Sequence, residues 1–274
     1  MFSLNCKGRL IPLTQPMVMG IINVTPDSFY ENSRAGDDQE VLKAAEKIIN
    51  EGAAFLDIGG QSTRPGSIRV NAADELKRVL PSIESIHRHF PEAIISIDTY
   101  HAAVAKEAVA AGAHIVNDIS AGSMDPEMIH TVAALQVPYI CMHMRGEPGD
   151  MQQMAHYDNV TREVLDFFIR KTDELNQAGI VDVLIDPGFG FGKTAAHNFR
   201  LLKELATFKI LERPIVAGLS RKSTVYKTLG VPVEEALNGS TVLHTLALLN
   251  GANILRVHDV KEAMEIIRLL EAIK

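Results

Sequence analysis

Eight short apolar runs, each followed by a longer segment with helical spacing of apolar residues, recur along the whole chain. The runs contain five or six residues and show little polar-apolar alternation, as expected of parallel strands that are buried on both faces. The predicted strands are Met17–Ile22, Ala54–Gly59, Ile94–Asp98, His114–Asp118, Pro138–Met142, Asp182–Asp186, Pro214–Gly218 and Asn253–Val257.

Helical segments fill the intervals between these strands. In the last of them, Val260, Ala263 and Ile267 fall on one face, which favours packing of that face against a core. Eight strands that alternate with helices in 274 residues predict a (β/α)8 TIM barrel, with a doubly wound open sheet as the structural alternative. The predicted helices include Asp38–Glu51, Ala72–His89, Ala102–Ala111, Asn159–Ala178, Asn198–Ala206, Glu234–Asn250 and Asp259–Ile273.

The segment before the first barrel strand has the pattern of a small hairpin. Phe2–Cys6 and Arg9–Leu13 flank the turn residues Lys7 and Gly8, and such a hairpin could plug the bottom of the barrel. No low-complexity tract and no linker rich in Pro, Gly or Ser interrupts the rest of the chain. We therefore expect residues 1–274 to form a single barrel domain.

Charge and cysteine content exclude several classes of function. A formal net charge of −7 provides no basic field for nucleic acid or an anionic membrane surface, so any anion site must be local. Cys6 and Cys141 are the only cysteines, and Cys141 lies in an apolar run, which favours buried thiols in a reducing compartment. We find neither a signal peptide nor an apolar run of about 20 residues, and we expect a cytoplasmic protein.

The carboxyl ends of the predicted strands are polar almost without exception. In a (β/α)8 barrel these ends form the active-site face, so their residue types are a test of the predicted fold. Helix and turn caps explain some Asp and Asn residues there, but they do not explain Arg256 and His258 together. The ends carry Asn23, Asp57, Asp98, Asn117, Asp118, Met142, His143, Asp186, Ser220, Arg256 and His258.

Two glycine-containing segments were tested as phosphate sites. The first, Gly188–Thr194, ends in Gly-Lys-Thr like a P-loop, but the first glycine that a P-loop requires is Pro187 here, so we reject a nucleotide site. The second, Gly218–Ser223, follows the seventh strand and opens a helix beside Arg221 and Lys222, which predicts an anion site. The loops after the first two strands, 23–29 and 59–66, have the composition of mobile lids.

Zinc-binding motifs are missing from the sequence. It contains ten His residues but no H-E-x-x-H motif and no Cys/His cluster, which argues against tightly held zinc. A Mg²⁺ ion held mostly by substrate phosphates and by one or two protein oxygens remains compatible with the sequence, because that ion seldom needs a dedicated protein cage.

Eight segments in order together resemble the dihydropteroate synthase family, from the first strand to the last. They are Asn23–Phe29, Asp57–Gly66 (DIGGQSTRPG), Ser96–Thr99, Asn117–Ile119, Met142–Met144, Asp186–Lys193 (DPGFGFGK), Ser220–Ser223 and Arg256–Val260. The resemblance implies a Mg²⁺-dependent (β/α)8 enzyme of folate biosynthesis, usually a homodimer. Such an enzyme condenses 6-hydroxymethyl-7,8-dihydropterin pyrophosphate with 4-aminobenzoate and releases pyrophosphate and 7,8-dihydropteroate. By analogy, the last helices would form the dimer contact.

The resemblance also implies a role for individual residues. The pterin's polar edge would be held by Asp98, Asn117, Asp186 and Lys222, with Arg256 over one face of the ring and Met142 and Phe189 lining the pocket. A carboxylate such as Asp186 can accept two adjacent N–H groups of the aminopyrimidine, and Lys222 can meet its carbonyl. The pyrophosphate would be bound by Asn23, Thr63, Arg64, Arg256 and His258, with Mg²⁺ near Asn23.

For 4-aminobenzoate, the resemblance implies a carboxylate site at Lys222, Ser223 and the amides that open the following helix. The groups closing over its ring would be Phe29, Thr63, Arg64 and Pro65. The residues expected to carry the chemistry are Asp98, Lys222, Arg256, His258 and Arg64. Their task would be to stabilise the departing pyrophosphate more strongly in the transition state than in the bound substrate.

The chain departs from the commonest family pattern at three places. Gln61 stands where many members have Glu, Leu219 where Thr is frequent, and 30–33 reads Tyr-Glu-Asn-Ser where Ser-Asp-Gly-Gly is usual. The third change bears on the path of the first loop, because Asn32 and Ser33 adopt left-handed backbone angles less readily than glycine.

Two alternative functions share the pterin pocket. A methyltransferase that moves a methyl group from a methylated folate to a corrinoid would keep the Asp and Asn residues but has no need of a pyrophosphate clamp. A noncatalytic pterin-binding paralogue would be expected to lose some of the clamp residues. All of these are present in this sequence: Asn23, Arg64, Lys222, Arg256 and His258.

Overall fold

The computed structural model describes residues 2–24, 34–62, 67 and 69–273, and it contains a barrel of parallel strands. The strands are hydrogen-bonded in the order β8-β7-β6-β5-β4-β3-β10-β9, and a parallel bridge between Ile185 and Ile215 closes the barrel between β8 and β9. The predicted TIM barrel is therefore confirmed against the open sheet. The strands are β3 (Met17–Asn23), β4 (Phe55–Gly59), β5 (Ile94–Asp98), β6 (Ile115–Asp118), β7 (Tyr139–Met142), β8 (Val183–Asp186), β9 (Val216–Ala217) and β10 (Ile254–Val257).

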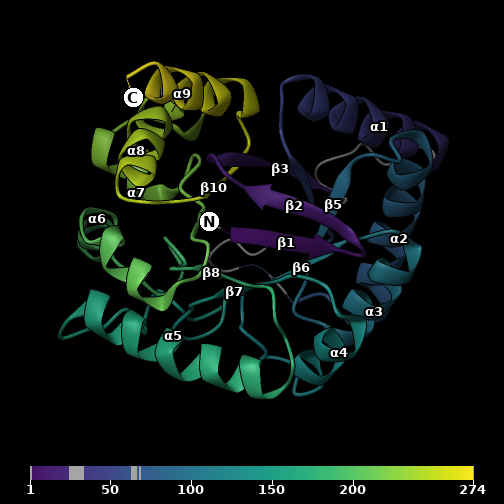
Figure 1. Cartoon of the computed structure of the whole chain (residues 1–274). Helices are drawn as coiled ribbons and strands as arrows, with labels where there is room; N and C mark the ends of the chain where they lie inside the picture. The colour runs from purple at the N-terminus through teal and green to yellow at the C-terminus, as the bar shows by residue number, and fades with distance from the viewer. Residues whose placement is uncertain (1, 25–33, 63–66, 68, 274) are drawn as a thin grey trace.

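Helices form a ring outside these strands, as Figure 1 shows. A large apolar cluster fills the space between the ring and the outward faces of the strands. No helix in the described part of the chain is both long enough and apolar enough to cross a membrane. The helices are α1 (Arg34–Asn50), α2 (Ala72–His89), α3 (Ala102–Ala111), α4 (Met128–Leu135), α5 (Val160–Gln177), α6 (Ala195–Lys203), α7 (Ser223–Leu229), α8 (Leu237–Leu249) and α9 (Val260–Ile273), with 3-10 turns η1 (Leu205–Leu211) and η2 (Val233–Glu235).

Side-chain caps set the start of several helices. Asn71 and Asn159 accept hydrogen bonds from the backbone N–H groups of Asp74 and Arg162 at the starts of α2 and α5. Thr194 begins α6 with a capping box, so this helix starts before the Asn198 expected from periodicity, and the segment after Lys203 winds as a 3-10 turn instead. The eight-residue helix α4 was not predicted, because so short an element carries little periodicity.

The hairpin of β1 (Phe2–Cys6) and β2 (Arg9–Leu13) crosses one end of the barrel (Figure 1). Leu4, Cys6 and Leu13 are buried there against one inward-facing apolar residue from each barrel strand, so the hairpin plugs the bottom as expected. The backbone N–H of Asn5 also donates to Asp182 Oδ2, 2.7 Å away, ahead of β8. The apolar layer consists of Met19, Phe55, Ile94, Ile115, Ile140, Leu184, Val216 and Ile254.

The side chains that point into the barrel change from apolar to polar towards the carboxyl ends of several strands. Side chains alternate between the two faces of a strand, so the residues two or four positions after the bottom layer point into the same interior. On β4 this face runs from Phe55 to Asp57, on β8 from Leu184 to Asp186, and on β10 from Ile254 to Arg256. The barrel is thus apolar where the hairpin seals it and polar at the opposite end.

Candidate active site

Asp57 is the centre of the polar end of the barrel. Its carboxylate is fully buried and accepts a hydrogen bond from Arg256 Nε at 2.6 Å. Its two oxygens also lie 3.4 and 3.2 Å from Asn117 Nδ2. Through these contacts one side chain joins β4, β6 and β10. A second carboxylate on β5, that of Asp98, accepts from Arg256 Nη2 at 2.5 Å, so Arg256 is held between two acids.

Burial and ion pairing act in opposite directions on these groups. Burial raises the pKa of Asp98, and the guanidinium of Arg256 partly offsets this. Burial alone would lower the pKa of Arg256, but Asp57 and Asp98 raise it above its ordinary value. The guanidinium therefore stays charged, and the negative charge around it is compensated inside the barrel instead of by water.

Lys222 and Asp186 form the second pair of opposite charges. A Cβ built on Gly218, which follows β9, would lie 3.6 Å from Lys222 Nζ and 3.9 Å from Asp186 Oδ2, so both side chains reach the space above this glycine. Lys222 Nζ donates to the carbonyl oxygen of Phe189 at 2.5 Å. Burial lowers the pKa of Lys222 to about 8, although Asp186 and Asp98 favour its charged form. Burial raises the pKa of Asp186, and Lys222 lowers it in turn.

Only one of the two cations predicted beside the seventh strand points into the site. Arg221 turns towards Asp259, with Nε–Oδ2 and Nη2–Oδ1 distances of 2.9 Å each, and its Nη1 donates to the carbonyl oxygen of Glu234. The expectation that Arg221 shares the anion site with Lys222 is therefore wrong, because Arg221, whose backbone is left-handed (φ 49°), pairs with the carboxylate of Asp259 in the next loop. That bidentate ion pair ties the loop after β9 to the loop after β10.

The expected role of Phe189 as a pocket-lining ring is also corrected. Its side chain is fully buried in the cluster between strands and helices, and only its carbonyl faces Lys222. Phe191 takes the expected place: its ring lies under Lys222 Nζ at 4.8 Å and packs in one cluster with Met142. Sequence alone could not separate two Phe residues two positions apart in a loop whose glycines adopt positive φ angles.

The remaining predicted residues are placed as follows. Asn23, Gly59 and Asp98 are neighbours across β3, β4 and β5, and a Cβ on Gly59 would lie 3.9 Å from Asn23 Oδ1 and 3.7 Å from Asp98 Oδ2. His258 is exposed just after β10, and its backbone N–H donates to Ser220 Oγ at 3.2 Å. Ser223 begins α7. Four predicted residues lie outside the described residues: Phe29, Thr63, Arg64 and Pro65.

Asp118, at the end of β6, has a structural role. Its carboxylate accepts from the hydroxyl and backbone N–H of Ser120, the N–H of Gly122 and the hydroxyl of Tyr139, at 2.7 to 2.8 Å. These contacts satisfy both oxygens and shape the turn after the strand, so Asp118 caps a turn, as an Asp at a strand end often does.

A buried polar network beside β4 was not predicted. Gln61 Nε2 donates to Glu75 Oε2 at 3.0 Å, and Gln61 Oε1 accepts from the hydroxyl of Tyr100 at 2.7 Å. Burial raises the pKa of Glu75 to about 8. An amide at position 61 can donate to Glu75 and accept from Tyr100 at once, which a carboxylate there cannot do when it is ionised. The one sequence signal for this network was the departure of Gln61 from the usual Glu.

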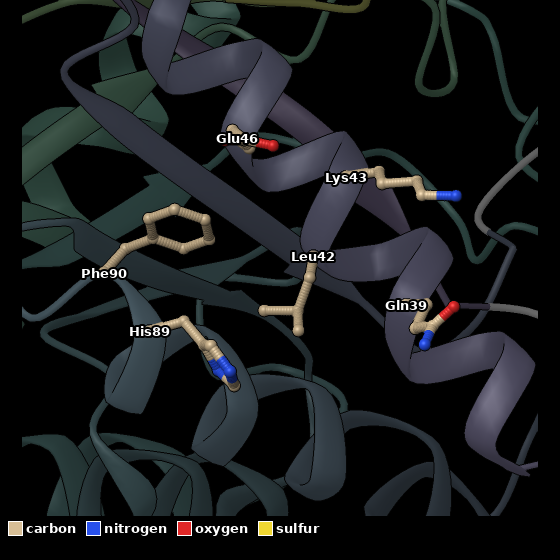
Figure 2. A pocket seen from close by; sticks show the side chains of 6 residues that line it. All are labelled: Gln39, Leu42, Lys43, Glu46, His89 and Phe90. Carbon is tan, nitrogen blue, oxygen red and sulfur yellow. The ribbon is translucent and has the colours of Figure 1, made fainter.

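A cavity of about 390 Å³ lies outside the barrel, away from these groups. Figure 2 shows that its lining side chains come from α1, from His89 at the end of α2 and from Phe90, which follows that helix. None of the strand-end residues lines it, so it has no part in the chemistry described above.

Among the described residues, no group of three or more His, Cys, Asp and Glu side chains could hold a metal ion by itself.

Comparison with known proteins agrees with this geometry. Residues 19–258 match the family of pterin binding enzymes. The dihydropteroate synthase of Escherichia coli strain K12 is 43% identical over 268 residues, which cover 97% of this chain and 94% of that protein. The solved structure of Xanthomonas albilineans dihydropteroate synthase with 4-aminobenzoic acid has a TM-score of 0.92 at 41% identity, covering 99% of this chain and 97% of the other. A structure of that enzyme with 7,8-dihydropteroate has a TM-score of 0.89 at 37% identity, covering 99% and 98%.

Replacement of Asp57 tests its place at the centre of this end of the barrel. Asp57→Asn keeps the shape of the side chain but leaves a buried guanidinium with one acid fewer, so we expect the free energy of unfolding to fall by about 3 kcal/mol. Urea unfolding followed by circular dichroism measures the loss. The matched control is Asp166→Asn, which breaks an exposed helical pair with Arg162 and should cost less than about 1 kcal/mol. Equal losses in the two variants would contradict the assignment.

Proposed function

The chain belongs to the dihydropteroate synthase family of pterin-binding enzymes, and from this premise we propose how its residues divide the work of the reaction. It is a transferase of folate biosynthesis that joins the dihydropterin pyrophosphate and 4-aminobenzoate into 7,8-dihydropteroate. The observation that supports the division of roles best is the pairing of acids and cations at the strand ends. Arg256 is held by Asp57 and Asp98, and Lys222 approaches Asp186 above Gly218.

The pterin site is assigned to the Asp186 side of the barrel. The aminopyrimidine edge of a pterin offers adjacent N–H donors beside a carbonyl acceptor. A carboxylate and an ammonium that reach the same space can meet these groups together. Asp186 and Lys222 are such a pair, while Asn117 and Asp98 provide further polar contacts along the ring system. The apolar surface beside the ring belongs to Met142 and, in place of Phe189, to Phe191.

Arg256 is assigned both to the pterin face and to the pyrophosphate. Its Nε and Nη2 donate to Asp57 and Asp98, so the plane of the guanidinium is set before substrate arrives. A planar guanidinium can stack on an aromatic ring and still donate at its edge, which a lysine cannot do. We assign Nη1 to the pyrophosphate, together with Asn23, His258, Thr63 and Arg64.

The reaction breaks the C–O bond to pyrophosphate and forms a C–N bond to the amine of 4-aminobenzoate. That amine is a weak nucleophile, so we propose that the C–O bond breaks first and leaves a resonance-stabilised pterin methylene cation. Negative charge then grows on the departing pyrophosphate, and the cations that meet it lower the barrier because they bind the transition state more tightly than the ground state. Exclusion of water protects the cation until the amine attacks it.

The second substrate is assigned to the start of α7. Ser223 and Lys222 would bind the carboxylate of 4-aminobenzoate. Lys222 also faces the proposed pterin site above Gly218, so it would lie between the two substrates. Phe29, Thr63, Arg64 and Pro65 complete this assignment from the family motifs. The solved relative that contains 4-aminobenzoic acid supports a site for this molecule on the same fold.

A Mg²⁺ ion is proposed near Asn23. The amide oxygen of Asn23 faces the space above Gly59, and such a hard oxygen donor fits an ion that takes its other ligands from pyrophosphate and water. When bound, the ion would neutralise charge on the leaving pyrophosphate. Since the described residues offer no cluster that holds a metal alone, the ion is expected to enter with substrate.

A homodimer is proposed through the last helices. Val242, Leu246 and Leu249 lie on one face of α8 at helical spacing and are 42 to 63% exposed, and Leu269 of the neighbouring helix α9 is 67% exposed. So many large apolar side chains together on a surface are typical of a protein interface.

We also propose a cytoplasmic location, because Cys6 and Cys141 are buried and free, as suits a reducing compartment.

The dimer proposal predicts that a charge in this apolar stripe separates the subunits. Leu246→Glu is expected to convert a dimeric wild type into a monomer, because the carboxylate would have to be buried in the interface. Sedimentation equilibrium measures the mass of each variant. Val181→Glu, at an isolated exposed position after α5, is the control and should leave the mass unchanged. A monomeric wild type, or a dimeric Leu246→Glu variant, would contradict the proposal.

The two cations assigned to catalysis give the central test. Arg256→Ala and Lys222→Ala should each lower turnover by at least about 100-fold, the range seen when charge-stabilising groups are removed. The assay supplies dihydropterin pyrophosphate, 4-aminobenzoate and Mg²⁺, and follows pyrophosphate and dihydropteroate. Omission of Mg²⁺ with added chelator should also lower the rate. Methyl transfer from a methylated folate to a corrinoid protein is the control for the alternative function. Near-normal turnover in both variants would refute the assigned roles.

Asp186 should distinguish the two substrates. Because its carboxylate is assigned to the pterin edge alone, Asp186→Ala should weaken binding of the pterin substrate by about 10-fold or more and leave that of 4-aminobenzoate nearly unchanged. Isothermal titration calorimetry with each ligand in turn gives the two affinities. Equal losses for both ligands would count against a dedicated pterin carboxylate.

A further inference from the structure

Lys193 is a buried lysine that the reaction leaves without a role. It is 2% exposed, and its Nζ lies among four acceptors. These are His143 Nδ1 at 2.9 Å, the carbonyl oxygens of Gly188 and Phe191 at 3.0 Å, and the carbonyl oxygen of His143 at 3.2 Å. Burial lowers the pKa of Lys193 well below its ordinary value, and the carboxylate of Asp186 only partly offsets this.

The glycines of the same segment create this arrangement. Gly188, Gly190 and Gly192 all have positive φ angles, between 62° and 87°. A Cβ at Gly188 would lie 1.9 Å from the carbonyl oxygen of His143, and one at Gly192 would lie 2.2 Å from that of Arg145. Only glycine lets the loop pack so closely on the chain after β7. The segment that superficially resembles a P-loop thus directs carbonyl oxygens at the Nζ of Lys193, where a P-loop directs N–H groups at a phosphate.

The carbonyl groups of this loop are divided among three partners. Those of Gly188 and Phe191 accept from Lys193, that of Phe189 accepts from Lys222, and that of Gly190 accepts from Gln152 at 2.9 Å. The Phe189 carbonyl therefore stands between two peptide groups that Lys193 holds. The peptide group of the Gly188 carbonyl is the direct neighbour of that of Phe189, and the peptide group of the Phe191 carbonyl is two further along, so a shift of either one would move the oxygen to which Lys222 is bound.

We propose that Lys193 is a positioning residue for Lys222, acting through the backbone of residues 188–191. Lys193 holds the loop against His143, the loop holds the carbonyl of Phe189, and this carbonyl sets where the Lys222 ammonium meets the pterin. The inference rests on the proposed role of Lys222 in pterin binding. It assigns Lys193 no contact with substrate.

A purely structural role would give different results. It predicts a loss of stability and an affinity loss that does not depend on the residue at position 222. The positioning role predicts that the loss of affinity depends on Lys222, because without that ammonium the place of the Phe189 carbonyl no longer matters to the ligand. Coupling between two residues that act through shared contacts is measured by a double-mutant cycle.

The experiment measures binding of dihydropterin pyrophosphate by calorimetry in four proteins: wild type, Lys193→Met, Lys222→Met and the double variant. Lys193→Met is expected to weaken binding about 10-fold in the wild-type background and less than about 2-fold in the Lys222→Met background, which is a coupling of at least about 1 kcal/mol. Lys203→Met, an exposed lysine on α6, is the matched control and should change neither value. If Lys193→Met does not fold, Lys193→Gln, which keeps a donor, replaces it in the cycle.

A second readout is the alkaline limb of the pH profile of kcat/KM. Burial lowers the pKa of Lys222 to about 8, and the titratable groups that act on it are Asp186, Asp98, Arg256 and Lys193. The ammonium is lost as pH rises through this value, so activity should fall there. In Lys193→Met a displaced Lys222 should move this limb by half a pH unit or more, on the order of 0.7 kcal/mol. Lys193→Gln removes the same amine but keeps a donor to the loop carbonyls, so it should move the limb less, whereas a direct charge effect would move it equally in both variants.

Equal affinity losses in both backgrounds, with an unmoved alkaline limb, would overturn the inference and leave Lys193 as a structural residue. Failure of the wild type to bind the pterin pyrophosphate would instead overturn the proposed function. The two failures are therefore distinguishable.

Discussion

A buried ion-pair system at the carboxyl end of the barrel is the interaction on which the rest of the site depends. Arg256 is held by Asp57 and Asp98, and Asp57 also accepts from Asn117, so side chains from β4, β5, β6 and β10 form one connected group. Charges withdrawn from water need such compensation, since each would otherwise cost several kcal/mol. The compensation also holds the guanidinium in one orientation before any ligand binds, which preorganises the site for a planar, polar substrate.

Stability and chemistry occupy opposite ends of the same strands. The eight inward-facing apolar residues at the bottom pack under the N-terminal hairpin, and the next inward positions on several strands are charged or amide side chains. This separation lets the site be rich in buried charge while the lower barrel contributes apolar burial. Three basic side chains of the site region are each held by a different kind of partner. Arg256 is paired with acids, Lys222 lies near Asp186 and a carbonyl, and Lys193 is surrounded by carbonyls.

Much of the architecture follows from local pattern. Buried strands appear as apolar runs, and side chains two positions apart share a face, so Asp98, Asn117, Asp186 and Arg256 could be placed at the polar end of the barrel from the sequence. The hairpin boundaries were also predictable, because Lys7 and Gly8 are strong turn residues between two short β-type runs.

What the sequence determined by itself was therefore the barrel, the end of it that carries the chemistry, and the reaction implied by its motifs. Only the tertiary structure decided which neighbours pair: that Arg221 turns to Asp259, that Phe191 and not Phe189 faces Lys222, and that Asp57 joins three strands. Arg221 and Asp259, like Asp57 and Arg256, lie far apart in the chain. Phe189 and Phe191 lie in one loop, and only the path of its backbone decides which ring faces Lys222. Short-range periodicity contains no information about such contacts, which depend on barrel closure and on glycine φ angles.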